Sequence, residues 1–276
     1  YTVDCQQTHA HLYTVQLDFI APAVDALDLR LPAWIQGSYL IREFARHIEG
    51  LRAEGFLVRK QDKHTWRITP QDGGQFKGNE RVVVRYQVYA FDVSVRGAYL
   101  DAERGFFNPC CVCLQVLALP DIPCRLQFFL PKTLPAWQIA STLPVDAQSG
   151  FVAKDYTELL DAPFELGYFY PAEFAVQGVP HRLILSGLPQ QDWLAQGVDV
   201  PRLLRDIEAV CAYQMQFWGD VPFTHYDFML LITQNGYGGL EHTHSTALIA
   251  SPEHLPRLNH THQAQKYAEL LGLMSH

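Results

Sequence analysis

The sequence contains no run of basic residues. Lys and Arg total 21 against 29 Asp and Glu in 276 residues, which gives a formal net charge of -8 at pH 7 with the histidines neutral. Proteins that bind a phosphate backbone usually gather Lys and Arg on one face or in one segment. The charge balance therefore excludes nucleic acid as an expected partner.

A long apolar run is also missing. The most apolar segment, residues 110–119, is about half of the ~20 residues that a helix needs to cross a bilayer, and it carries Gln115. We therefore expect no membrane-spanning segment and no membrane partner. With 48% hydrophobic and 18% charged residues, the composition is that of a folded globular protein.

Cysteine is scarce, with six residues in the whole chain. This is not the disulfide framework of a small secreted domain, so a reducing cytoplasm is the expected compartment. Cys110, Cys111, Cys113 and Cys124 together suggest a thiolate metal site. If residues 110–116 form a strand, however, Cys110 faces away from Cys111 and Cys113, and we interpret these residues as small buried hydrophobic side chains.

The first 170 residues contain short segments in which apolar and polar residues alternate. This two-residue period predicts strands with one face toward a core and one toward water. Turn residues separate the segments and no long helical pattern interrupts them, so residues 1–170 are predicted to form an antiparallel β-sandwich. The alternating apolar positions are Tyr13, Val15, Leu17 and Phe19; Trp66 and Ile68; Val82, Val84, Tyr86 and Val88; and Leu126, Phe128 and Leu130.

Residues 171–276 mix strand and helix patterns. Asp199 is a good N-cap for a helix with apolar residues at helical spacing, and Gly219 is a fitting end for it. Strands are expected over residues 226–233 and, after a glycine-rich turn, over residues 240–250. The spaced positions of the helix are Leu203, Ile207, Val210, Cys211, Gln214 and Phe217.

A last helix is expected to start near Asn259 or Thr261. No Gly, Pro or basic last turn ends it before His276, so we expect the polypeptide to be the front part of a longer protein. The residues predicted to share one face of this helix are Ala264, Tyr267, Ala268, Leu271 and Met274.

Histidines cluster in the last quarter of the chain, and imidazole is the commonest metal ligand in proteins. If the segment after Gly239 is extended, Leu240, His242 and His244 share one face and Glu241 points to the other. A zinc site formed by His242 and His244 is an alternative for which the spacing supplies no third ligand, so hydrogen-bonding roles are favoured. The clustered residues are His225, His242, His244, His254, His260, His262 and His276.

Residues 238–242, Gly-Gly-Leu-Glu-His, with Ser245 after them, resemble the signature of the glycyl aminopeptidase family, peptidase family M61. These are zinc peptidases of the gluzincin clan that usually carry a PDZ domain after the catalytic domain. Residues 34–47 and 104–108 resemble the amino-terminal region of the same family. The three segments occur in order over nearly the whole chain, which makes the resemblance more specific than one short motif.

The resemblance implies a function. Residues 171–276 are expected to be an incomplete thermolysin-like peptidase domain, truncated at the zinc-binding helix. Residues 271–276 resemble the approach to the H-E-x-x-H motif, so His276 is expected to be its first zinc ligand. The general base and the other zinc ligands are expected beyond His276, so no catalytic residue is expected within the chain, and the fragment alone is expected to be inactive and free of zinc.

The same resemblance implies a zinc-dependent aminopeptidase that releases small amino-terminal residues, Gly or Ala, from a peptide with a free amino terminus. Glu241 is expected to pair with the substrate's amino group, and Gly238, Gly239 and His242 are expected to bind substrate with it. If so, the carboxylate of Glu241 and the imidazole of His276 flank a common cleft and lie within the roughly 7 Å reach of an extended dipeptide. An alternative is a non-catalytic β-sandwich module that binds peptides by strand addition.

Overall fold

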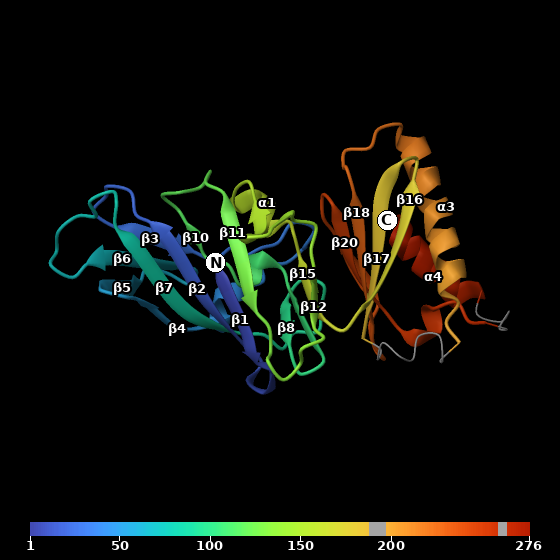
Figure 1. Cartoon of the computed structure of the whole chain (residues 1–276), viewed down its shortest axis with the longest axis horizontal. Helices are drawn as coiled ribbons and strands as arrows, with labels where there is room; N and C mark the ends of the chain where they lie inside the picture. The colour runs from blue at the N-terminus through green and yellow to red at the C-terminus, as the bar shows by residue number, and fades with distance from the viewer. Residues whose placement is uncertain (188–196, 259–263) are drawn as a thin grey trace. The chain divides into compact units, whose positions relative to one another are not determined.

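The computed structural model describes residues 1–187, 197–258 and 264–276. The chain is mainly β, as predicted, and it forms two compact units (Figure 1). One unit contains residues 1–137 and 143–164, and the other contains residues 138–142 and 165–276. The domain assignment made from the sequence, with its boundary after residue 170, stays a prediction.

The first unit is built from short strands and a few single helical turns. Its strands are β1 (Thr2–Gln7), β2 (Leu12–Ile20), β3 (Leu27–Arg30), β4 (Ile48–Ala53), β5 (Phe56–Lys60), β6 (Thr65–Pro70), β7 (Arg81–Tyr89), β8 (Ala98–Leu100), β9 (Arg104–Phe107), β10 (Gln115–Val116), β11 (Cys124–Phe129), β13 (Val145–Asp146) and β14 (Gly150–Ala153). Its helical segments are the 3₁₀ turns η1 (Thr8–Ala10), η2 (Phe44–His47) and η3 (Pro109–Cys111) and the short helix α1 (Tyr156–Leu160).

A seven-stranded sheet, in the order β13-β14-β11-β1-β2-β7-β4, dominates the first unit, and β10-β3-β6-β5 form a second sheet. The predicted alternation in β2 is confirmed, because Tyr13, Val15, Leu17 and Phe19 are buried and the residues between them are partly exposed. The larger sheet is not wholly antiparallel, because β1 pairs with β11 in parallel. More than a hundred residues separate these two strands, so no hairpin imposes an antiparallel pairing on them.

The cysteine-rich segment is not one continuous strand over residues 110–116, the case considered in the sequence analysis, because only residues 115–116 form a strand, β10. Residues 109–111 form the 3₁₀ turn η3, in which Cys111 N donates to Asn108 O at 2.8 Å. Pro109 explains the difference, because proline has no N–H for a strand ladder and its fixed φ suits a helix start. The interpretation as small buried residues is confirmed, because all six cysteines are free and buried.

The second unit places two helices on one face of a mixed five-stranded sheet with the order β16-β17-β18-β20-β19. Strands β17, β18 and β20 are parallel, and the edge strands β16 and β19 are antiparallel to their neighbours. Its elements are β12 (Gln138–Ala140), β15 (Phe164–Gly167, which starts at the last residue of the first unit), β16 (Tyr170–Val176), β17 (Val179–Ser186), α3 (Val200–Trp218), β18 (Tyr226–Ile232), β19 (Gly238–Glu241), β20 (Ser245–Ala250), the 3₁₀ turn η4 (Pro252–His254) and α4 (Ala264–Ser275).

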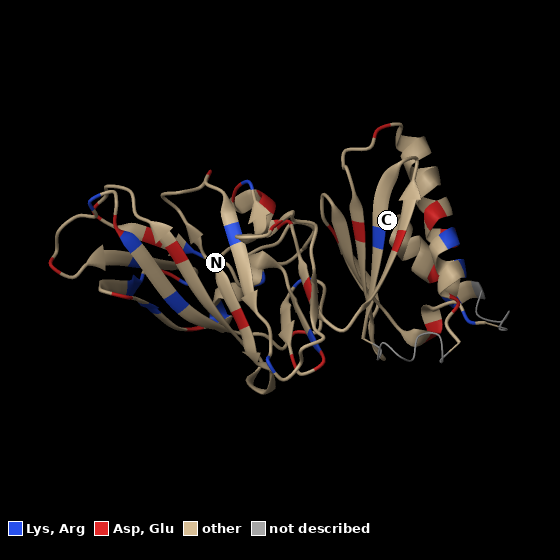
Figure 2. Ribbon diagram, viewed as in Figure 1, with Lys and Arg blue, Asp and Glu red and all other residues tan. Residues whose placement is uncertain are grey.

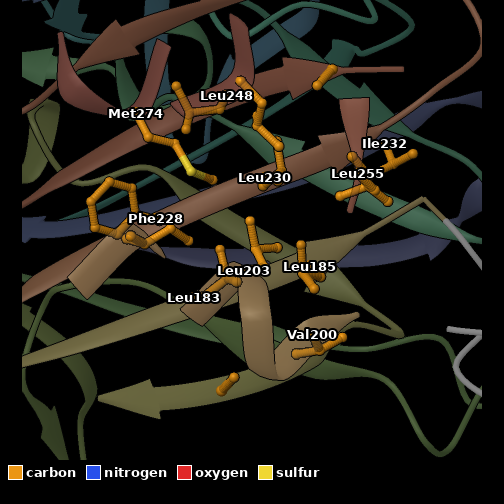
Figure 3. Close-up of a cluster of buried hydrophobic side chains, with 14 of the residues drawn as sticks. Leu183, Leu185, Val200, Leu203, Phe228, Leu230, Ile232, Leu248, Leu255 and Met274 are labelled. Carbon is orange, nitrogen blue, oxygen red and sulfur yellow. The ribbon is translucent and has the colours of Figure 1, made fainter. Parts of the chain in front are cut away.

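The core of the second unit lies between this sheet and the two helices (Figure 3). Every second residue of a strand faces the helices, and each helix buries one apolar face against the sheet, because side chains repeat every two residues in a strand and about every 3.6 residues in an α-helix. Fully burying one such side chain contributes about 1.5–3 kcal/mol. The residues labelled in the figure are Leu183, Leu185, Val200, Leu203, Phe228, Leu230, Ile232, Leu248, Leu255 and Met274.

Helix α3 begins and ends where the sequence predicts. The Asp199 carboxylate accepts a hydrogen bond from Arg202 N at 3.0 Å, and Gly219 ends the helix in the left-handed conformation with φ of 70°. Its buried face includes Met215 in place of Phe217, which is 65% exposed.

In α4, Tyr267, Leu270 and Met274 are buried and Ala268 is exposed, so the face turns slightly from the one we predicted. The predicted start at Asn259 or Thr261 lies outside the described residues. Among the helices of the described ranges, none is both long and apolar enough to span a bilayer.

Replacing Asp199 with Ala removes the hydrogen-bond acceptor at the start of α3. We expect Asp199→Ala to lower the free energy of unfolding by about 1 kcal/mol, measured by urea denaturation followed with circular dichroism. Glu208→Ala, an exposed position in the middle of the same helix, is the matched control and should change it by less than about 0.5 kcal/mol. Equal losses in the two variants would contradict the capping role.

Candidate functional site

The signature residues lie on a hairpin at the edge of the second unit's sheet. We expected one strand over residues 240–250, but β19 ends at Glu241 and β20 begins at Ser245. His242 N donates to Ser245 O at 2.8 Å and closes the turn between the two strands. Because the chain turns back between them, β20 pairs with β18 on one side and with β19 on the other. A single strand over residues 240–250 could not form the pairing between β19 and β20. Glu241 is therefore the last residue of an edge strand.

Glycine is required at the two signature positions for different structural reasons. Gly238 has φ of +146°, a conformation that residues with a Cβ rarely adopt. At Gly239 a Cβ would stand 2.8 Å from Leu248 Cδ2 and 3.5 Å from Leu273 Cδ1. The missing side chain thus leaves room for α4 to approach β19 closely.

The structure brings Glu241 and His276 together. His276 Nδ1 lies 2.7 Å from Glu241 Oε1, although 35 residues separate them in the chain. Their side chains are 77% and 47% exposed, respectively, so both groups face solvent beside their contact. The predicted proximity within about 7 Å is therefore found, but the groups touch one another instead of flanking an open space. Their roles toward metal and substrate stay predictions.

Three contacts fix α4 above β19. Gln214 of α3 donates from Nε2 to Ser275 Oγ at 2.6 Å, and Tyr237 in the glycine-rich loop donates to Glu269 O at 3.0 Å. Near the start of α4, Tyr267 donates to the carboxylate of Asp206 at 2.8 Å. The helix is thus held at both ends, which places His276 opposite the end of β19.

His254 adds a fourth support. Its Nδ1 accepts from Ser251 N at 3.2 Å, so the ring proton of the neutral side chain is on Nε2, 3.5 Å from a Glu269 oxygen. The Tyr237 ring stacks on the imidazole with centroids 5.4 Å apart. Turn η4, the glycine-rich loop and α4 are therefore joined at this histidine.

The remaining histidines do not assemble a metal site with each other. His242 follows β19 in the turn, where its side chain is buried, and the rings of His244 and His225 stack with centroids 5.2 Å apart. In the described part of the chain no group of three or more His, Cys, Asp or Glu side chains is placed to hold a metal ion. His260 and His262 lie outside the described residues. The assignment of His242 to substrate binding stays a prediction.

A charged row that we did not predict crosses the sheet on the face away from the helices. Glu173, Arg182 and Asp227 are register partners on β16, β17 and β18, and Figure 2 shows them as red, blue and red bands. Arg182 pairs with Asp227 through two hydrogen bonds and also donates to Ser141 O at 3.1 Å. Burial raises the pKa of the Asp227 carboxyl, and the Arg182 guanidinium offsets part of that effect.

This row borders an open cleft of about 530 Å³ that His181 and His225 also line. The feature of the sequence that could have indicated this charged row is Asp227, which directly precedes the apolar run of residues 228–232. A charge at the start of a buried strand needs a partner, because an unpaired buried charge is costly. The partner strand could not be identified without the sheet order.

Replacing Gly238 tests the backbone of the signature strand. We expect Gly238→Ala to lower the free energy of unfolding by about 1–3 kcal/mol, because alanine is strained at this φ, as calorimetry would measure. Gly272→Ala is the matched control, since a Cβ at Gly272 in α4 meets nothing within 4 Å. That control should be neutral or stabilise the protein by up to about 1 kcal/mol. A Gly238→Ala variant as stable as the unaltered chain would refute the role of this conformation.

Comparison with solved structures found a match over almost the whole chain. The fold is similar to the crystal structure of an aminopeptidase N family protein from Idiomarina loihiensis, with a TM-score of 0.89 and 35% sequence identity. The match covers 99% of this chain and 46% of the other, so the chain spans less than half of that protein's length. An M1 zinc metallopeptidase from Deinococcus radiodurans is a weaker match, with a TM-score of 0.47 and 14% identity, covering 90% of this chain and 58% of the other. A comparison with curated proteins gave no match.

A family model matches the first part of the chain. Residues 1–168 match the peptidase M61 N-terminal domain, which is more than half of the sequence. This is the family that the three sequence segments resemble, and two of those segments lie within the matched residues. The chain belongs to the peptidase M61 family.

Proposed function

We propose that the chain is the amino-terminal part of a zinc-dependent aminopeptidase that releases small amino-terminal residues, Gly or Ala, from peptides. The observation that carries this proposal is the contact between Glu241 and His276 at 2.7 Å. It joins the family signature strand to the helix expected to begin the zinc motif, in a chain that belongs to a peptidase family.

We also propose that the second unit belongs to a thermolysin-like catalytic domain. Its mixed sheet with an antiparallel edge strand, covered on one face by α3 and α4, supports this assignment. The outer edge of β19 pairs with no other strand among the described residues. We propose that an extended peptide adds to this edge as a further strand.

The residues within the described ranges do not form a complete zinc site. His276 would supply one ligand, and no group of three donors exists among the residues that the structure describes. Catalytic zinc sites usually have three protein ligands, and we propose that the other two follow residue 276 in a longer polypeptide. When bound, zinc would polarise the scissile carbonyl.

The role that we propose for Glu241 is recognition of the substrate's amino group. That group is cationic over much of the working pH range, and a carboxylate binds it through charge-assisted hydrogen bonds. Because Glu241 lies beside His276, a bound amino group would hold the first peptide bond at a fixed distance from the metal. We propose that Gly238, where a Cβ meets nothing within 4 Å, leaves space for the peptide beside the strand, whereas Gly239 contributes by letting α4 approach β19.

The reading frame beyond residue 276 tests the proposed function. We expect H-E-x-x-H to be completed directly after Ser275, and the longer polypeptide to bind about one zinc ion, as zinc analysis would show. It should hydrolyse the p-nitroanilides of Gly and Ala. A stop codon or an unrelated sequence at this point would overturn the proposal and leave a non-catalytic peptide-binding module as the better explanation.

Amino-group recognition has its own test in the longer polypeptide. We expect Glu241→Gln to lower kcat/KM for peptides with a free amino terminus by about 10- to 100-fold, since a hydrogen bond to a charged group contributes about 1.5–3 kcal/mol. The preference for free over acetylated peptides should fall with it. Glu208→Gln, on the exposed face of α3, is the charge-matched control and should leave both unchanged. An undiminished preference in Glu241→Gln would rule out this role.

A further inference from the structure

Helix α3 ends in an exposed group of aromatic side chains, which we call the aromatic end of α3: Tyr213, Phe217 and Trp218. Their exposed fractions are 67%, 65% and 73%. The Tyr213 and Phe217 rings stack with centroids 6.4 Å apart, and the Phe217 and Trp218 rings meet edge to face at 5.2 Å. Contiguous apolar surface of this kind usually marks a contact with another segment or protein.

The two helices of this unit run in the same direction and in step. Tyr267 of α4 contacts Asp206 of α3, and Ser275 of α4 contacts Gln214 of α3. Both contacts join residues that are 61 positions apart in the sequence. A constant offset over two contacts means that each turn of α4 lies beside a fixed turn of α3, because both helices rise 1.5 Å per residue.

The aromatic end of α3 extends beyond the last residue of α4. Ser275 lies beside Gln214, whereas α3 continues for one more turn to Trp218. On a helix, Phe217 and Trp218 stand at small angles on either side of Gln214, so they flank the line along which α4 points. Adding the offset of 61 to their numbers gives positions 278 and 279, which lie beyond this sequence.

We propose that the aromatic end of α3 is the docking face for the next turn of α4 in a longer polypeptide. The proposal rests on the proposed function, under which α4 continues with H-E-x-x-H from His276. Positions 278 and 279 are then the two variable positions of the motif. The chemistry of the aromatic rings requires apolar side chains there, so that one face of the continued helix meets the rings while the motif's histidines face elsewhere.

The occupant follows from the chain itself. The similar aminopeptidase N family protein is more than twice as long as the matched region, so chain of the right length is available in a relative. Because α4 lies in register with α3, a continuation of α4 would pass beside the aromatic end of α3. A second copy of this unit is the competing occupant, and it predicts burial that depends on protein concentration.

Quenching of tryptophan fluorescence by acrylamide tests the packing directly. The Trp218 component is obtained by comparing each protein with its Trp218→Phe variant, in the 276-residue chain and in the longer polypeptide. We expect the quenching constant of Trp218 to be severalfold lower in the longer polypeptide, with or without EDTA. Equal constants in the two proteins, shielding that appears only at high concentration, or polar residues at both positions 278 and 279 would each overturn the proposal.

A stability comparison separates this proposal from the proposed function. Phe217→Ala should lower the melting temperature of the longer polypeptide by several degrees but not that of the 276-residue chain, while Glu208→Ala should affect both alike. Neither readout requires zinc or activity. If the rings are shielded in a longer polypeptide that has no peptidase activity, the proposed function is wrong and the docking proposal stands. If the rings are exposed in an active peptidase, the docking proposal is wrong and the proposed function stands.

Discussion

The candidate site depends on how closely α4 approaches the edge strand β19. Gly239 has no side chain to hold the helix away, and Leu273 occupies the space above it. Gln214 fixes the end of the helix from the side of α3. Since His276 immediately follows this end, its contact with Glu241 is set by packing that extends well beyond the two residues.

This dependence explains why the geometry of a five-residue signature depends on the whole unit. A core between helices and sheet determines the height of α4, and the network around His254 joins the helix to the glycine-rich loop. Side chains built on rigid elements keep their geometry better than those on loops. Glu241 lies at the end of a strand and His276 at the end of a helix, so each has such support.

The sequence was a good guide where one physical rule dominates. Alternation in β2 and the cap at Asp199 followed from local chemistry, and both are found. The predictions from the sequence were wrong where non-local packing determines the structure. Residues 242–244 could either continue a strand or form a turn, and the choice depends on the pairing of the following strand β20 with β18. Phe217 fits the helical spacing equally well in a core and on a surface. The contact of Glu241 with His276 came from family resemblance, because no local rule links residues that distant.

The burial of the cysteines has a practical consequence. Burial raises the pKa of Cys5, Cys111 and Cys113, and it raises the pKa to about 11 in Cys124 and about 12 in Cys211. Thiols react as thiolates, so alkylating reagents should reach them only when the fold opens. Cys211 is the one cysteine of the second unit, and the other five belong to the first. The alkylation rate of Cys211 therefore reports how often the second unit opens, and the rates of the other five cysteines report how often the first unit opens.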